Sequence, residues 1–232
     1  MTVSLHVWRV PAAAVPRALW RMARDPGRVR RSGTRFVKLL GTGTGFGPSR
    51  PDLTRWAALT VQDGRPPDFP GWARIAAASC RLDLRPLASR GSWRGRQPFE
   101  VQDAAEVRGR TDAPDGPVLA LTRARLRPSR ALSFWRAAGP VGAALAGRDG
   151  LLAAFGIGEA PIGWQGTVSV WREPADLVRF AYRHPEHRRA IERTATTGWY
   201  AEELFARFAV TGVVGDTGVI GWARQAKERR SG

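Results

Sequence analysis

Cysteine is almost absent from this chain, because Cys80 is the only one among 232 residues. A single cysteine excludes an internal disulfide and any zinc site built from several thiolates. Cys80 ends an alanine-rich run, so we expect it to pack as a small apolar side chain. Histidine is scarce as well, with three in the chain. So few ligands exclude a metal cage that is built only from protein side chains.

Long apolar runs are also missing. No segment reaches the ~18 uncharged apolar residues that a membrane-spanning helix needs. Near the N-terminus, Arg9 and Pro11 interrupt the apolar run, so the pattern of a signal peptide is absent. We therefore expect a soluble cytoplasmic protein, with peripheral binding to a membrane surface as the alternative.

Lysine is nearly absent too, although the chain is strongly basic. Lys38 and Lys227 are the only lysines among 37 basic residues, and the formal net charge is +17. Such a charge favours nucleic acid, an anionic membrane surface or an acidic ligand as partner, although a GC-rich coding sequence also enriches arginine. The sequence argues against nucleic acid as the partner, since neither an RNA-binding sheet motif nor a helix-turn-helix signature is present. The densest basic block lies within residues 9–38.

Tryptophan, in contrast, is abundant, with ten residues spread along the chain. Large flat side chains suit a pocket for a large flat ligand or a long apolar one. They also fill cores and face partner proteins. The composition leaves both uses open.

The first half of the chain alternates between strand and helix patterns. Helical periodicity predicts one helix at 15–22, which ends before Pro26, and another at 72–79. Alternating and β-branched side chains predict strands at residues 3–10, 36–40 and 55–61.

Glycines follow the second predicted strand in the segment RFVKLLGTGTGFG at 35–47. Their spacing matches a dinucleotide-binding turn, but such a site needs a helix to begin at the last glycine. Pro48 and Pro51 follow there instead, which argues against the dinucleotide site. We expect the alternating Gly and Thr to bring this strand end close to a ligand or to a neighbouring backbone.

The second half repeats this plan at low identity. Apolar strands with glycines or turn residues recur at 118–126, 150–163 and 165–174, helices are predicted at 129–146 and 174–183, and a strand at 209–215 closes the half. Each half thus has the order strand, helix, strand, strand, helix, strand, which is ferredoxin-like. The predicted fold class is α+β, with two tandem ferredoxin-like units packed as a pseudo-symmetric dimeric α/β barrel. Its parts are an N-terminal unit (1–88), an Arg/Gly-rich arm (89–116), a C-terminal unit (117–215) and a basic tail (216–232). The pocket is expected between sheet and helices.

Two of the three histidines lie in the segment 180–208. The same segment contains the pair Trp199-Tyr200, which precedes a predicted apolar helix. Pro185 predicts a helix break at His184 and a new helix start, because the residue before a proline favours extended backbone. His187 then falls in the first helical turn, where the helix dipole favours the neutral imidazole. A buried, hydrogen-bonded histidine and an axial metal ligand both fit this pattern.

Three strings are similar to the spheroidene monooxygenase family of carotenoid 2-ketolases. They are FVKLLGTGTG (36–45), FGIGEAPIG with its downstream VSVW (155–171), and FAYRxxxH followed by TGWYAEELFARF (180–208). The resemblance covers roughly residues 3–215 and is weaker at 80–116.

The resemblance implies an enzyme that binds haem b iron and inserts oxygen into a long apolar substrate, using dioxygen and an external electron donor. The same family outline also serves proteins outside carotenoid pathways, so the substrate does not carry over with the fold. A haem enzyme of redox-neutral, dehydratase-like type with a nitrogen-containing substrate is the alternative. A non-enzymatic nucleic-acid-binding protein is the second alternative, and a homo-oligomer is compatible with each.

Carried over by motif, the axial iron ligand is His187, while Pro185 makes His184 the poorer match. One axial histidine is all that haem requires, which suits a chain with three histidines. Lys38 or Arg123 is the candidate cation beside a haem propionate or an oxygen-derived ligand, unless each is a solvated charge on an edge strand. Tyr200 completes the candidate catalytic group. The further cofactor contacts suggested are Gly43, Thr44, Trp164 and Glu203.

Two of these candidates also have simpler explanations. Glu203 would orient the imidazole through its second nitrogen, or it would stabilise the start of a helix. Trp164 and Trp171 would line the apolar side of the pocket, although core packing suits Trp171 equally well. His6, on the first predicted strand, is expected to be structural.

Overall fold

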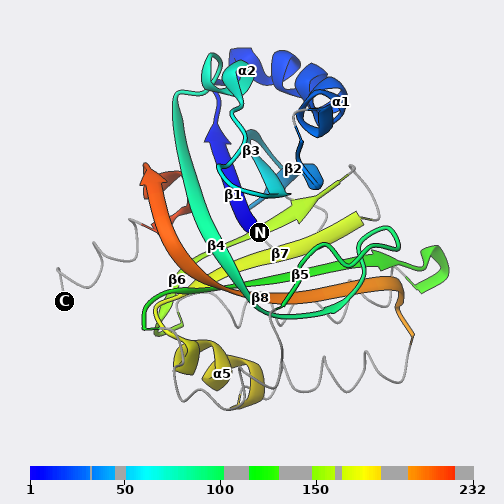
Figure 1. Ribbon diagram of the computed structural model, residues 1–232, viewed down its shortest axis with the longest axis vertical. Helices are drawn as coiled ribbons and strands as arrows, with labels where there is room; N and C mark the ends of the chain where they lie inside the picture. The colour runs from blue at the N-terminus through cyan, green and yellow to red at the C-terminus, as the bar shows by residue number, and fades with distance from the viewer. Residues whose placement is uncertain are drawn as a thin grey trace.

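The computed structural model describes residues 1–31, 33–44, 51–101, 115–130, 148–159, 164–183 and 198–222. Within these ranges eight antiparallel strands close into one barrel, in the order β1-β3-β2-β6-β7-β5-β8-β4 (Figure 1). The strands are β1 (Thr2–Arg9), β2 (Phe36–Gly43), β3 (Pro51–Gln62), β4 (Ala78–Gly91), β5 (Val118–Leu126), β6 (Leu151–Gly158), β7 (Trp164–Trp171) and β8 (Tyr200–Gly215). The helices are α1 (Val15–Arg31), α2 (Pro70–Ala73) and α5 (Pro174–Arg183), with short 3-10 turns η1 (Ala12–Ala14), η2 (Pro128–Arg130) and η3 (Thr217–Ile220).

The two halves of the barrel have the same strand order. The first half runs β4-β1-β3-β2 and the second runs β8-β5-β7-β6, and the helices lie outside the sheet (Figure 1). β2 meets β6 through the pairs Gly41↔Gly158, Thr42↔Ile157 and Gly43↔Gly156. At the other junction β4 and β8 pair along most of their length. The predicted barrel is therefore present as one closed sheet.

The glycine-rich end of β2 meets the backbone of a neighbouring strand. Gly41 and Gly43 each lie opposite a glycine of β6. A Cβ on Gly41 would lie 3.8 Å from the Gly158 carbonyl oxygen, which is an ordinary contact, so the close approach expected for these glycines stays a prediction.

The barrel interior is a packed core. On β1, Val3, Leu5 and Val7 point inward, whereas Ser4 and His6 face out, because side chains alternate along a strand. Every strand contributes to this interior. Its largest fully buried members include Trp93, Phe155, Phe208, Leu5, Leu40, Leu82, Leu119 and Leu204.

A second core lies on the outer face of the first half, beneath α1 and α2. Ala18 and Val29 of α1 pack against Trp8, Trp56 and Trp72, and the rings of Trp8 and Trp72 stack with centroids 4.9 Å apart. Several of the abundant tryptophans therefore fill this core.

Two helix predictions in the first half were wrong in extent. α1 continues through Pro26 to Arg31, because apolar anchors on both sides of the proline hold the helix on the sheet at the cost of one backbone hydrogen bond. The helix predicted at 72–79 is limited to α2, since β4 begins at Ala78. Cys80 and Leu82 then alternate inward as strand residues do.

The helix predicted after Trp199 was also wrong, because Tyr200–Gly215 form strand β8. Its alanines, glutamates and leucine favour a helix in isolation. However, Leu204, Ala206 and Phe208 alternate into the barrel core, and β8 pairs with β5 on one side and β4 on the other. Tertiary pairing therefore overrides the local preference.

The residues after β8 begin with an ordered turn rather than a loose tail. The Asp216 carboxylate accepts a hydrogen bond from the Gly218 amide at 2.8 Å. Val219 and Ile220 are 3% and 1% exposed and join the barrel core. β4 likewise runs to Gly91, three residues past the predicted boundary at residue 88. Residues 102–114 of the arm, the helix predicted at 129–146 beyond Arg130, and both His184 and His187 lie outside the described residues.

Candidate active site

Lys38 and Arg123, the two cations selected from the sequence, meet inside one end of the barrel. Lys38 comes from β2 and Arg123 from β5, and both reach the carboxylate of Glu159, just after β6. The Lys38 Nζ lies 2.8 Å from Glu159 Oε2, and an Arg123 Nη lies 3.2 Å from Glu159 Oε1. Arg123 also pairs with Glu202 of β8. We call Lys38, Arg123, Glu159 and Glu202 the inner polar cluster.

A tight turn after β4 covers the inner polar cluster. Trp93 is fully buried, and its indole nitrogen donates to Glu159 at 2.5 Å. The Gly95 amide donates to Glu202 at 2.7 Å, and the Ser92 hydroxyl does so at 2.9 Å. Every carboxylate of the cluster therefore has several donors.

The charges in the cluster hold one another ionised. Burial alone would raise the pKa of Glu159, but the hydrogen bond from Lys38 and the indole of Trp93 keep it below its usual value. Burial opposes ionisation of Glu202 too, yet the Gly95 amide and Arg123 lower its pKa to about 2. Burial lowers the pKa of Lys38, against the pull of Glu159. The alternative of a solvated edge-strand charge is therefore wrong for Lys38 and Arg123, which form buried ion pairs.

On the outer face of the second half, the same strands present small side chains. The cross-strand pairs are Thr122↔Thr167, Ala120↔Ser169, Ala154↔Ser169 and Gly156↔Thr167. These side chains point away from the inner polar cluster, because residues 119, 121 and 123 of β5 face the interior. We call Ala120, Thr122, Ala154, Gly156, Thr167 and Ser169 the outer platform.

The outer platform differs from the matching face of the first half. There, bulky side chains such as Trp8, Trp56 and Leu39 are buried beneath α1. On the second half, Trp171 packs with Phe180 of α5, with ring centroids 5.3 Å apart, and so Trp171 is a core residue. Beyond Trp171 the platform side chains are only half-buried, apart from Gly156.

The other predicted site residues lie at the β2–β6 junction, on β8 and at the start of β7. Gly43 lies in the β2–β6 junction and Thr44 is an exposed bend residue after it. Tyr200 begins β8, half-buried, and its carbonyl accepts a hydrogen bond from Arg127 at 3.2 Å. Glu203 is 3.8 Å from Arg90 and partly exposed, on a strand rather than at a helix start. Trp164 begins β7, and its side chain, like His187, lies outside the described residues.

Glu159 and Glu202 are the members of the cluster that sequence reasoning missed. Both stand inside the strings used for the resemblance, GIGEAP and WYAEEL. A carboxylate between a glycine run and a proline was the available signal for Glu159. Pairing with Lys38, 121 residues away, gives no local signal.

His6 and Cys80 lie apart from the other candidate site residues. His6 is buried on the outer face of the first half beside Trp8 and Phe69, and burial lowers its pKa to about 4. Cys80 points into the barrel core, where burial raises its thiol pKa to about 11. Among the described residues, no three His, Cys, Asp or Glu side chains are grouped so as to hold a metal ion.

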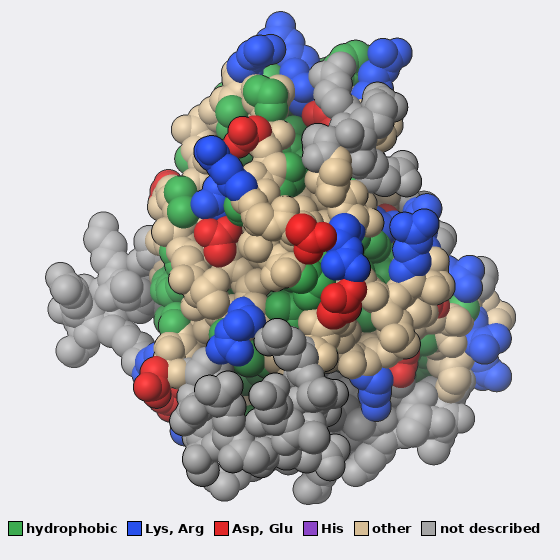
Figure 2. Space-filling view, in the orientation of Figure 1, with side chains coloured by type: hydrophobic (Ala, Val, Ile, Leu, Met, Phe, Trp, Pro, Cys, Tyr) green, Lys and Arg blue, Asp and Glu red, His purple; other side chains and the backbone are tan. Residues whose placement is uncertain are grey.

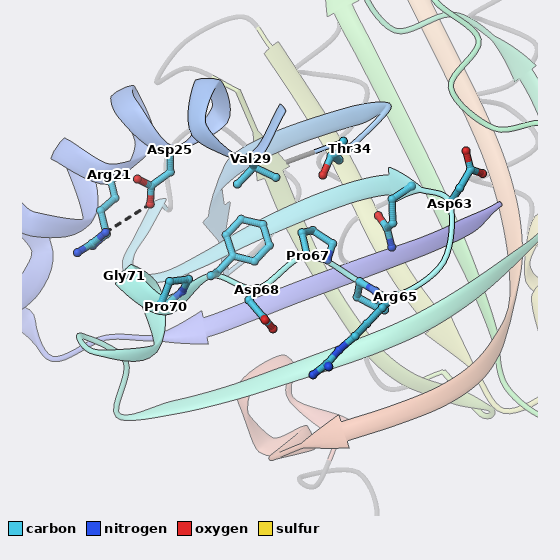
Figure 3. Close-up of a pocket in the computed structure, with 14 residues that line it drawn as sticks. Arg21, Asp25, Val29, Thr34, Asp63, Arg65, Pro67, Asp68, Pro70 and Gly71 are labelled. Carbon is cyan, nitrogen blue, oxygen red and sulfur yellow. Dashed lines mark ion pairs between the residues drawn. The ribbon is translucent and has the colours of Figure 1, made fainter. Parts of the chain in front are cut away.

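A cleft of about 480 Å³ lies between α1 and the loop that follows β3. Figure 3 shows Arg21, Asp25 and Val29 projecting from α1 towards the loop that carries Pro67 and Asp68. Arg21 and Asp25 form an ion pair of 3.5 Å. Among the described residues, no histidine, cysteine or lysine lines the cleft, and neither does any predicted site residue that the structure describes.

Comparison with known proteins gives the family. The chain is 36% identical over 191 residues to the spheroidene monooxygenase of Rhodobacter capsulatus, which covers 78% of this chain and 77% of that protein. It is 40% identical over 194 residues to the spheroidene monooxygenase of Rubrivivax gelatinosus, which covers 79% of this chain and 71% of that protein. The chain belongs to the spheroidene monooxygenase family. The family resemblance seen in the sequence is thus confirmed.

Membership of the spheroidene monooxygenase family supports an oxygenase activity, and so an oxidoreductase. A solved structure of aldoxime dehydratase aligns with this family member at a TM-score of 0.58 and 12% identity, covering 96% of this chain and 86% of that one. At such low identity the likeness shows the fold alone. No protein-family model matches the chain. In the described part of this spheroidene monooxygenase relative, no helix is both long and apolar enough to cross a bilayer.

Proposed function

We propose that the chain is a haem-dependent monooxygenase that inserts oxygen into a long apolar substrate of carotenoid type, with an external electron donor. Two observations support the haem. One is the small set of side chains that can serve as its axial ligand. The other, which carries the proposal, is the outer platform.

Elimination reduces the number of candidates for the axial iron ligand. His6 is buried among aromatic rings on the first half, and Cys80 is a neutral thiol inside the barrel core. The chain has three histidines in all, so the imidazole for an iron comes from His184 or His187. The family motif selects His187, and we propose it as the axial ligand.

The outer platform suits a broad flat group. Small side chains on adjacent strands leave a level surface where the equivalent face of the first half is filled by Trp8 and Trp56. Ala120 and Ala154 already pack beside Trp171, so a planar ring system would lie over the part of the platform formed by Thr122, Gly156 and Thr167. Haem, when bound, would supply an iron centre at which dioxygen is activated.

The chain's own residues would then divide the work. Thr122 and Thr167 would support the ring, and Trp164 would border it at the start of β7. Glu203 and Tyr200, at the start of β8, would orient the imidazole and the substrate. Gly43 and Thr44 would close the pocket edge beside the β2–β6 junction.

Lys38 and Arg123 have a different role in this proposal. Both point to the inner face of the sheet and are held by Glu159. We therefore assign them to fixing the strands beneath the outer platform rather than to contact with the cofactor.

The first test is an absorption spectrum of the purified protein. A Soret band and a pyridine haemochrome of haem b are expected for the wild type, and His187→Ala should lose most of the haem while His184→Ala retains it. The reverse order would transfer the ligand to His184. A colourless protein that haemin fails to reconstitute would refute the proposal.

The second test fills the outer platform. Thr167→Phe should weaken haem binding at least about tenfold, because the ring would occupy the space above the strands. Thr167→Val keeps the volume and should bind haem like the wild type.

Turnover that requires dioxygen and a reductant separates a monooxygenase from a redox-neutral dehydratase.

We also propose that the barrel consists of two tandem ferredoxin-like units. The matching strand orders β4-β1-β3-β2 and β8-β5-β7-β6 support this arrangement, as does the order strand, helix, strand, strand, helix, strand in the first half. The first unit would extend to the end of β4 at Gly91 and the second would run from Val118 to Gly215. A crystal structure in which the halves superpose strand for strand is the test.

A further inference from the structure

We propose that the outer face of α1 docks on a membrane surface that contains anionic lipid. The inference goes beyond the proposed reaction, since it rests on the exposure and charge of one helix and needs no haem. The α1 outer face is defined by Arg17, Leu19, Trp20, Ala23 and Arg24, all of which are exposed.

Two large apolar side chains stand out from this helix. Leu19 is 52% exposed and Trp20 is 51% exposed, next to one another on the face that points away from the barrel. The opposite face of α1 is buried, because Ala18 and Val29 pack against the sheet. Exposed Leu and Trp thus add nothing to the core. Adjacent exposed apolar side chains of this size mark an interaction surface.

Arginines flank these apolar side chains. The Arg24 guanidinium lies 4.9 Å from the centre of the Trp20 ring. Neither Arg17 nor Arg24 forms an ion pair with any residue in the described ranges. The single acid of α1, Asp25, is turned inward to Arg21. The face therefore carries positive charge that the protein itself does not neutralise.

The position of α1 suits contact with a flat surface. The helix lies at one end of the long axis of the molecule, on the outside of the barrel (Figure 1). Figure 2 shows Lys and Arg side chains gathered over this end, with hydrophobic side chains among them. Cations and apolar groups thus share one protruding face.

This mixture favours lipid over nucleic acid. Helices that lie in a membrane interface place Trp and Leu at the acyl boundary while arginines reach the headgroups. Anionic headgroups attract each such arginine at low salt. Phosphates of nucleic acid would attract the arginines equally, but they would leave the Leu19 side chain in water.

Vesicle co-sedimentation of the full-length protein tests the proposal. Vesicles of phosphatidylcholine with phosphatidylglycerol should bind the wild type, whereas pure phosphatidylcholine should bind it at least about tenfold more weakly. Arg17→Gln with Arg24→Gln should lower the partition coefficient on the anionic vesicles about fivefold per arginine. Trp20→Ala with Leu19→Ala should lower it about tenfold or more, and 0.5 M salt should leave this apolar part in place.

Matched controls separate this face from the overall charge. Arg85→Gln with Arg207→Gln removes the same two charges from exposed positions on β4 and β8, and should have less than a twofold effect. Val214→Ala, 50% exposed, is the control for an exposed apolar side chain.

A label locates the contact directly. Leu19→Cys carrying an environment-sensitive fluorophore should shift to shorter wavelength when anionic vesicles are added. Cys80 is 2% exposed, with a pKa raised by burial to about 11, so it stays unlabelled.

Two results would overturn the proposal. One is an equal loss of vesicle binding in the control pair and in the Arg17 and Arg24 pair, which would make the binding a property of net charge. The other is an absence of vesicle binding together with tight, salt-dependent binding of DNA or RNA that the α1 substitutions weaken. Haem content, measured in parallel, should be the same in all of these variants, so a failure of the haem proposal leaves this test intact.

Discussion

Replacing Glu159 by Gln should destabilise the protein more than any exposed charge change of the same kind. The Glu159 carboxylate is 7% exposed. It accepts hydrogen bonds from Lys38 at 2.8 Å and from the Trp93 indole at 2.5 Å, and it forms further ion pairs with Arg94 and Arg123. A glutamine keeps the shape but leaves the buried cations without this negative charge. Removing one partner of a buried ion pair costs about 3–5 kcal/mol.

The lower end of that range applies here, because Arg123 keeps its pairing with Glu202. For a domain of this size each kcal/mol shifts Tm by roughly 2–4 °C. Thermal unfolding followed by circular dichroism should therefore show Tm lower by about 6–12 °C for Glu159→Gln. If the Tm stays within about 2 °C of the wild type, the cluster contributes little and the reasoning is wrong.

Two comparisons separate the ion pair from general effects. Glu203→Gln removes a carboxylate that is 37% exposed and 3.8 Å from Arg90, and such a pair is worth at most about 1 kcal/mol. Adding Lys38→Met to Glu159→Gln removes a buried charge as well, and should recover part of the lost stability. The haem spectrum should be retained in these variants whenever they are folded, because the cluster faces away from the outer platform.

Two further results are expected from other parts of the fold. The free energy of unfolding should fall as the pH drops from about 6.5 towards 4, because burial lowers the pKa of His6 to about 4 in the folded state and the native protein resists its protonation. The loss should reach about 3 kcal/mol in urea titrations, and His6→Leu should flatten this pH dependence. Gly91→Ala should destabilise the protein by about 3 kcal/mol or more in the same assay, because Gly91 has a φ of +90° and an added Cβ would lie 2.1 Å from the Glu203 carbonyl oxygen. Gly95 has a φ of +71° and open space around it. Gly95→Ala should therefore cost only the backbone strain, about 1 kcal/mol.

Local patterns predicted the elements whose signals lie in adjacent residues. β5 was predicted at 118–126 and is found there, because its side chains alternate. α5 begins at Pro174, as expected for proline at a helix start. The order β1, α1, β2, β3 and α2 followed from the same signals, whereas no local pattern had been assigned to β4.

The features that the sequence did not predict depend on contacts between residues far apart in the chain. β8 contains residues that favour helix, and only its pairing with β4 and β5 makes it a strand. Lys38 and Arg123 were selected individually as cations, but their shared partner Glu159 became apparent only when three strands converged. Alternation could place a side chain inside or outside the sheet, but it could not show which charges meet there.

The place of β8 in the barrel also affects how the protein is made on the ribosome. Of the eight described strands β8 is synthesised last, yet it lies between β5 and β4 and joins the second half to the first. Until residue 215 has left the exit tunnel, β4 keeps an unpaired edge, and so does β5. A nascent chain that stalls earlier presents two open sheet edges, which are templates for aggregation. The final strand thus decides whether the nascent chain closes on itself or pairs with its neighbours.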